Sequence, residues 1–156
     1  MLSKLKLFFN KSFNKQEIIK FQNPYFLGTE IKNIISTINS KELIGPNNFI
    51  EKCERLLEKQ LACKNVLLTA SGTDALEMAC ILANFKSGDE VLMPSFNFPS
   101  AATSVLRCGA KPVFININRS DMNLSINNIK KSINKKTKGI IIVHYAGLSA
   151  PMSEII

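Results

Sequence analysis

The chain has 156 residues, a formal net charge of +8, 46% hydrophobic residues and 21% charged residues. This composition is that of a globular domain with a core of its own, and no apolar run reaches the roughly 20 residues that cross a bilayer. The cysteines do not form a C-x-x-C pair and there is one histidine, so a zinc or iron–sulfur site has little support. We expect reduced, mostly buried thiols in a cytosolic protein. The cysteines are Cys53, Cys63, Cys80 and Cys108.

The lysines are concentrated in two places, residues 1–20 and residues 130–138. The first stretch is a poor signal peptide, because Lys6 interrupts its apolar segment and no small-residue cleavage site follows. We expect a basic extension, with an amphipathic arm on a membrane surface as the alternative. The second stretch ends a predicted helix, where cations complement the dipole. Since the chain holds no nucleic-acid motif, we expect no nucleic-acid partner.

Two helices are predicted ahead of the first strand. The first covers residues 29–40, with Thr29 as a candidate cap, and the second begins at Asn47 or Asn48. Apolar side chains recur at helical spacing in the first (Ile31, Ile34, Ile35, Ile38) and lie on one face of the second (Phe49, Cys53, Leu56, Leu57).

Strands and helices alternate through the rest of the chain. Short apolar runs predict strands at 66–69, 90–94, 111–115 and 139–144, and helices are predicted at 73–85, 99–107 and 125–134. This alternation indicates βαβ crossovers and a mainly parallel sheet covered on both faces, a three-layer α/β/α fold. Gly88 and Gly109 are predicted to end helices. We expect one domain over residues 21–156.

Ligands of such sheets bind at the carboxyl ends of the strands. Three segments leave those ends: residues 69–73, 94–102 and 144–147. The sequence therefore predicts a site built from these three segments.

The first segment places Ser71-Gly72-Thr73 directly before a helix. Free N–H groups at a helix start, a glycine without a β-carbon and two hydroxyls make a cradle for a phosphate. The run has neither the remaining glycines of G-x-G-x-x-G nor the lysine of a P-loop. The alternative is that Ser71 or Thr73 only caps the helix.

The second segment has Phe96 and Phe98 on either side of Asn97. An aromatic ring near a phosphate cradle favours a flat cofactor stacked on it. The alternative is that these rings belong to the core.

Three stretches, in this order, resemble the sugar-nucleotide aminotransferases, which are pyridoxal-phosphate enzymes of fold type I. They are "LLTASGTDALEMA", "SGDEVLMPSFNFPSAATSVLRCGAKPVF" and "TKGIIIVHYAG". The resemblance runs from about residue 20 to residue 156 and is strongest to the transaminases that make dTDP-4-amino-4,6-dideoxygalactose. It identifies the chain as the N-terminal part of the large, cofactor-binding domain of such an enzyme.

The resemblance implies roles for individual residues. Ser71, Gly72 and Thr73 match the turn that binds the phosphate of pyridoxal 5'-phosphate, and Phe98 matches the ring that stacks on its pyridine. Asn97 and His144 are candidate substrate contacts. For His144 the favoured alternative is a polar side chain that is simply satisfied at a strand end.

The resemblance also implies a reaction. Glutamate donates the amino group to a keto sugar nucleotide similar to dTDP-4-keto-6-deoxyglucose. The product serves surface polysaccharides such as the O-antigen of lipopolysaccharide, and the enzyme is a cytoplasmic homodimer.

The lysine and the pyridine-pairing aspartate of these enzymes match no residue up to Ile156. The alternatives are a sugar dehydratase with histidine in place of that lysine, a remnant that binds phosphates or pairs with a paralogue, and a general nucleotide-binding domain. We also expect residues 66–69 to lack the strand that neighbours them in the family. That would leave backbone groups and apolar faces open and make the chain prone to associate.

Overall fold

The computed structural model describes residues 22–41 and 48–156. The chain divides into two compact units, residues 1–52 and 53–156, and each is described by itself. The predicted boundary near residue 20 lies outside the described residues. In the part of the chain that is described, no helix is long and apolar enough to span a membrane.

The first unit contains α2 (Glu30–Ser40), as predicted from its isoleucines. All four isoleucines of the stripe are exposed. Thr29 occupies the capping position, but its side chain makes no capping bond. Instead the carboxylate of Glu30 accepts hydrogen bonds from the N–H groups of Leu27 and Gly28, at 2.7 and 2.8 Å, and fixes the turn before the helix. The helix ends at Lys41, whose φ is +60°.

Helix α3 (Asn48–Leu61) crosses the boundary between the units. Its start agrees with the prediction at Asn48, whereas Asn47 lies outside the described residues. None of its side chains is buried, and Cys53 on α3 and Cys63 just after it are exposed. The expectation of mostly buried thiols is therefore wrong, because Cys80 is buried and Cys108 is half-buried, whereas α3, on or just after which the other two lie, has no buried residue. Burial, with a smaller effect of Cys108, raises the pKa of the Cys80 thiol.

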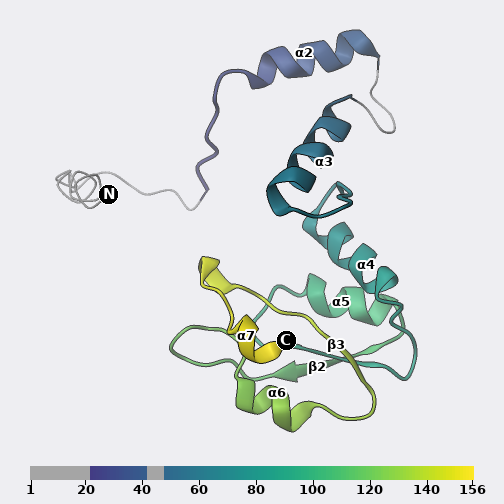
Figure 1. Cartoon of the computed structure of the whole chain (residues 1–156), viewed down its shortest axis with the longest axis vertical. Coiled ribbons are helices and arrows are strands. Elements are labelled where there is room, and N and C mark those ends of the chain that lie inside the picture. Colours follow the sequence, from purple (N-terminus) through teal and green to yellow (C-terminus); the bar gives the residue numbers. More distant parts are fainter. Residues whose placement is uncertain (1–21, 42–47) are drawn as a thin grey trace, which may run out of the picture. The chain divides into compact units, whose positions relative to one another are not determined.

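The second unit is built on a parallel sheet with the strand order β2-β1-β3. Figure 1 labels β2 and β3 of this sheet. Strands β1 (Glu90–Pro94) and β2 (Lys111–Ile115) have the predicted bounds. Strand β3 (Thr137–Ile140) ends four residues before the predicted end at His144. The last bond of its ladder runs from Ile141 N–H to the carbonyl of Leu92, at 2.8 Å. The next donor would be Pro94, which has no N–H, and the ladder stops there.

Residues 66–69 are not a strand, so this prediction is wrong. No described strand lies beside them, but two of their backbone donors have side-chain acceptors, so the expectation of open backbone groups is wrong for these two. The N–H groups of Val66 and Leu68 donate to Glu58 and Glu54 of α3, at 3.3 and 3.1 Å. Leu67 and Leu68 are exposed, which agrees with the expected open apolar surface, while association itself stays a prediction.

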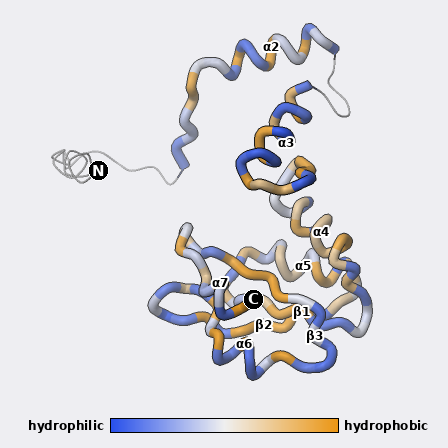
Figure 2. Tube along the Cα trace, viewed as in Figure 1, coloured by the Kyte–Doolittle hydropathy of each residue, from blue (hydrophilic) through white to orange (hydrophobic). Residues whose placement is uncertain are grey.

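Helices cover both faces of the sheet. Successive residues of β1 point to opposite faces, so they pack against different helices. Val91 and Met93 pack with residues from α4 (Gly72–Leu82) and α5 (Ser100–Arg107), whereas Leu92 packs on the side of α6 (Ile126–Ser132) and α7 (Met152–Ile155). Figure 2 shows this apolar centre between hydrophilic turns. The mainly parallel three-layer fold is confirmed. The clusters are Cys80, Val91, Met93, Val105 and Ala110, and Leu92, Ile115, Leu124 and Ile129.

The two glycines predicted to end helices differ. Gly109 follows α5 directly with a φ of +77°, as predicted. Gly88 also has a positive φ, +92°, but it lies in the turn before β1, well after α4 ends at Leu82. Asn84 adopts the left-handed conformation at the end of α4 instead.

Glu90 links the start of β1 to two neighbours. Its carboxylate accepts hydrogen bonds from Asn134 Nδ2 at 2.8 Å and from Lys111 Nζ at 3.1 Å. The bonds from Asn134 and then Lys111 hold the pKa of this carboxyl below its ordinary value of 4.5.

Because the folded pKa is depressed, the stabilisation by Glu90 is present above pH 4.5 and is lost as pH falls through the folded value. We expect Glu90→Gln to lower the melting temperature at pH 7, and the difference from the parent chain to shrink on acidification. Thermal melts at pH 7 and pH 3 measure this. An equal difference at both pH values would contradict the assignment.

Candidate cofactor site

The first part of the predicted site is the start of α4. Ser71 is its N-cap: Ser71 Oγ accepts a hydrogen bond from the N–H of Asp74 at 3.1 Å, and its carbonyl accepts one from Thr69 Oγ1 at 2.8 Å. The capping role considered for Ser71 is thus observed. Capping uses Ser71 as an acceptor, so its hydroxyl hydrogen remains able to donate.

The start of α4 fits a phosphate in two respects. The N–H groups of Gly72 and Thr73 have no partner among the described residues. A β-carbon placed on Gly72 would meet no atom within 4 Å, so a ligand has room to reach these donors. The positive end of the helix dipole lies at the same place, although the carboxylate of Asp74 in the first turn offsets part of it.

The second part is the loop between β1 and α5. The N–H of Ser95 donates to the carbonyl of Ile115 at 2.8 Å, which holds the loop against the end of β2. Asn97 Oδ1 accepts a bond from the N–H of Phe98 at 2.7 Å, whereas Asn97 Nδ2 is buried without a partner among the described residues. The ring of Phe98 is 75% exposed, so it is not a core residue.

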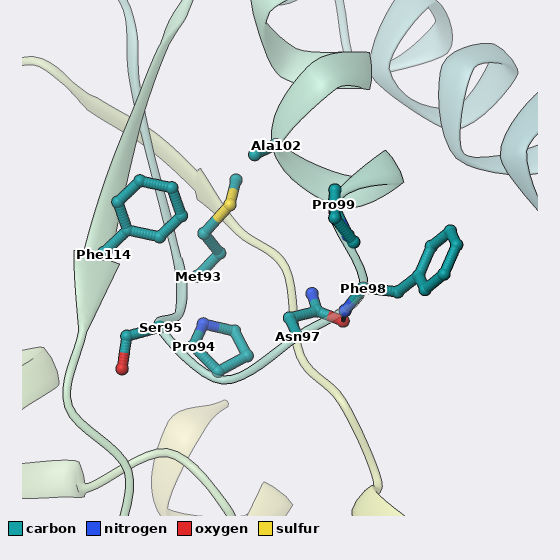
Figure 3. Close-up of a pocket in the computed structure, with 8 residues that line it drawn as sticks. All are labelled: Met93, Pro94, Ser95, Asn97, Phe98, Pro99, Ala102 and Phe114. Carbon is teal, nitrogen blue, oxygen red and sulfur yellow. Dashed lines mark hydrogen bonds between the residues drawn. The ribbon is translucent and has the colours of Figure 1, made fainter.

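A hollow of about 230 Å³ lies at this loop. Figure 3 shows the ring of Phe114 on one side of it, and the ring of Phe98 turned away from the other lining residues. The lining residues are Met93, Pro94, Ser95, Asn97, Phe98, Pro99, Ala102 and Phe114.

The third part follows β3. His144 Nδ1 accepts a hydrogen bond from the N–H of Ala150 at 3.0 Å, so this side chain already has a structural partner. The next residue, Tyr145, contacts Phe96, with ring centroids 5.2 Å apart and planes inclined by 51°. Sequence reasoning missed Tyr145. The pattern that could have identified it is an aromatic residue directly after the predicted strand at 139–144.

The structure joins two of the three predicted segments directly. Phe96 and Tyr145 connect the loops after β1 and β3, and Asn97 and Phe98 line one hollow. Ser71, Gly72 and Thr73 are not among the residues that line that hollow, whereas Phe98 is. The helices that follow these two segments do pack together, through an ion pair of 2.9 Å between Glu77 of α4 and Arg107 of α5. A common ligand for both segments stays a prediction.

The described residues contain no group of three or more histidine, cysteine or acidic side chains placed to hold a metal ion.

Comparison with known families matches residues 26–156 to the model of the DegT/DnrJ/EryC1/StrS aminotransferase family. The chain belongs to this family. The match includes all three segments of the predicted site and confirms the resemblance at the level of sugar aminotransferases that use pyridoxal phosphate.

Two relatives show the range of the DegT/DnrJ/EryC1/StrS family. GDP-perosamine synthase of Vibrio cholerae is 29% identical over 138 residues, which are 88% of this chain and 38% of that protein. The 3-oxo-glucose-6-phosphate:glutamate aminotransferase of Bacillus subtilis is 30% identical over 131 residues, 81% of this chain and 29% of the relative. The chain thus spans about a third of the length of these relatives.

A solved structure agrees with the family assignment. The PMP form of Spr1654 from Streptococcus pneumoniae superposes with a TM-score of 0.83 at 25% identity, over 89% of this chain and 35% of the other. Its PLP form gives the same TM-score. Pyridoxal phosphate as the cofactor of the family is therefore confirmed. The narrower likeness to dTDP-4-amino-4,6-dideoxygalactose transaminases stays a prediction.

Proposed function

We propose that residues 53–156 form the part of a sugar aminotransferase that binds the phosphate of pyridoxal 5'-phosphate. The observation that supports this most directly is the open start of α4, where two N–H groups lack partners and Gly72 leaves space in front of them. When bound, this cofactor supplies an electron sink for moving amino groups. The chain contributes binding and orientation.

Each residue of the proposed site has a defined role. Gly72 and Thr73 donate backbone N–H groups to the phosphate, and the Thr73 hydroxyl adds a third donor. Ser71 caps the first turn of α4 by accepting the bond from the N–H of Asp74, and its hydroxyl hydrogen donates to the phosphate. The exposed ring of Phe98 provides a face for the pyridine, and the bond from its N–H to Asn97 fixes the backbone from which that ring projects.

The proposed reaction transfers an amino group from glutamate to a keto sugar carried by a nucleotide, similar to dTDP-4-keto-6-deoxyglucose. The names of the two relatives support this, since one makes a GDP-linked amino sugar and the other pairs glutamate with a keto sugar phosphate. We further propose that the product serves a surface polysaccharide and that the enzyme acts in the cytoplasm as a homodimer. Asn97 and His144 remain the proposed substrate contacts.

The lysine and the aspartate implied by the family resemblance match no residue among the 156. The proposal for this chain is therefore a binding function. The proton transfers of the reaction are assigned to no residue of it.

Titration of the purified chain with pyridoxal 5'-phosphate, followed by absorbance, tests the proposal. We expect saturable binding that inorganic phosphate weakens by competition. Phe98→Leu should raise the dissociation constant about twofold to tenfold, because stacking contributes about 0.5–1.5 kcal/mol beyond burial.

Phe26→Leu is the matched control. Phe26 is 73% exposed, close to the value for Phe98, but it belongs to the first unit and is not among the residues that line the hollow. We expect it to bind the cofactor as the parent chain does. Equal losses in both variants would argue against stacking on Phe98, and no competition by phosphate would argue against the cradle. Treatment with borohydride separates this binding from random reaction with surface lysines, which would attach the cofactor covalently at many sites.

A further inference from the structure

Asn123 is a buried polar residue at the carboxyl edge of the sheet, in the turn between β2 and α6. Its side chain is only 1% exposed. Its backbone is fully used: its N–H donates to Asp121 Oδ1 at 3.0 Å, and its carbonyl accepts from the N–H of Asn118 at 2.9 Å. The turn therefore holds Asn123 in one position.

The Asn123 side chain reaches from this turn to the loop after β3. Its Nδ2 donates to the carbonyl of Leu148 at 3.3 Å, across 25 residues of sequence. Its Oδ1 is buried and has no partner among the described residues. One half of the amide thus bonds to the loop, and the other half is unpaired.

The loop that Asn123 holds, residues 144–150, is a closed unit. The N–H of Gly147 donates to the carbonyl of His144 at 3.1 Å, and the N–H of Leu148 donates to the carbonyl of Tyr145 at 2.9 Å. The bond from the N–H of Ala150 to His144 Nδ1 closes the loop. Tyr145 then connects it to Phe96 of the loop after β1. A shift at Leu148 would therefore move His144 and Tyr145 with it.

An unpaired buried oxygen lowers the stability of the folded chain, and an apolar side chain of similar size would avoid that cost. Leu148 is 55% exposed, so we expect water to reach its carbonyl if the amide were removed. Asn123 thus contributes little to folding, and its contribution is the placement of the loop. We propose that Asn123 is a positioning residue that fixes the 144–150 loop, with His144 and Tyr145, beside the loop after β1. Its relevance to substrate rests on the function proposed above, but the placement itself does not.

The test is Asn123→Leu, followed by NMR on the full chain. An accepting Nδ1 requires neutral His144 to carry its proton on Nε2. In the variant we expect the ¹⁵N shifts of His144, the only histidine, to move toward a mixture of tautomers. The amide of Ala150 should exchange about threefold to tenfold faster, as for loss of one hydrogen bond. The unfolding midpoint should stay close to that of the parent chain.

Asn116→Leu is the matched control, since Asn116 begins the same turn and is exposed. It should leave the His144 shifts and the Ala150 exchange unchanged. If Asn123→Leu does not fold, Asn123→Ser decides, because its hydroxyl is too short to reach Leu148 and water can fill the space. Parent-like His144 shifts and exchange in the folded variant would overturn the proposal, as would equal changes in the control.

Titration of the same variants with pyridoxal 5'-phosphate keeps the two proposals apart. We expect Asn123→Leu to bind the cofactor like the parent chain, because the proposed cradle lies on α4. A parent chain that binds no cofactor would overturn the function proposed above and leave the placement of the loop by Asn123 intact. A parent-like loop in Asn123→Leu together with normal cofactor binding would overturn only the role of Asn123.

Discussion

Gly72→Val is expected to weaken binding of pyridoxal 5'-phosphate by about tenfold to hundredfold. The valine side chain would stand where the phosphate approaches the N–H groups of Gly72 and Thr73, and each charge-assisted hydrogen bond lost costs about 1.5–3 kcal/mol. Folding should not suffer, because a β-carbon on Gly72 meets no atom within 4 Å and the backbone there is not left-handed. Absorbance titrations with the cofactor and thermal melts by circular dichroism measure the two effects separately.

Ala83→Val is the matched control for this experiment. Ala83 is the C-cap of α4 and is exposed, so the substitution adds the same kind of bulk at the opposite end of the same helix. Its cofactor affinity should equal that of the parent chain. If Gly72→Val binds as tightly as the parent chain, the phosphate does not sit at the start of α4, and the proposed function loses its main support.

Leu92→Ala is expected to lower the free energy of unfolding by about 2–5 kcal/mol, the usual range for a leucine removed from a well-packed core. Leu92 is 0% exposed and lies on the central strand, where it packs with Ile115, Leu124 and Ile129. Few neighbours can move into the space, because β1 is paired on both sides. Urea denaturation at low protein concentration measures the change.

Leu82→Ala provides the comparison. Leu82 ends α4 and is 75% exposed, so truncating it should alter the free energy of unfolding by less than about 0.5 kcal/mol. A loss at Leu92 no larger than the loss at Leu82 would mean that the second core cluster is not packed as described.

The parts of the fold that the sequence predicts best are those whose partners lie nearby in the chain. The bounds of β1 and β2 follow from short apolar runs between turns, and the two strands pair with each other in register from Glu90 and Lys111 onward. The prediction fails where a neighbouring strand determines whether a segment pairs and where it ends. Residues 66–69 have the composition of a strand, but no described strand lies beside them, and β3 stops early because Pro94 on its neighbour has no N–H.

In the candidate site, too, sequence predicts the local features but not the contacts that depend on distant residues. Residue type and order indicate a helix start suited to phosphate and an aromatic residue in the next loop, and the structure gives both, an open α4 terminus and an exposed Phe98. Sequence cannot give the partners of single polar atoms. The bonds of Asn97 to Phe98 and of His144 to Ala150 depend on loop conformations that no spacing rule specifies.

Glu54 and Glu58, one turn apart on α3, affect whether residues 66–69 can pair with another chain. Their carboxylates accept hydrogen bonds from the N–H groups of Leu68 and Val66, so these two donors are not open to another chain. A chain that paired with these residues would first have to displace the two carboxylates. Glutamate has the reach for this and aspartate is one methylene shorter. With the shorter side chain, the N–H groups of Val66 and Leu68 would be open to pairing with another chain.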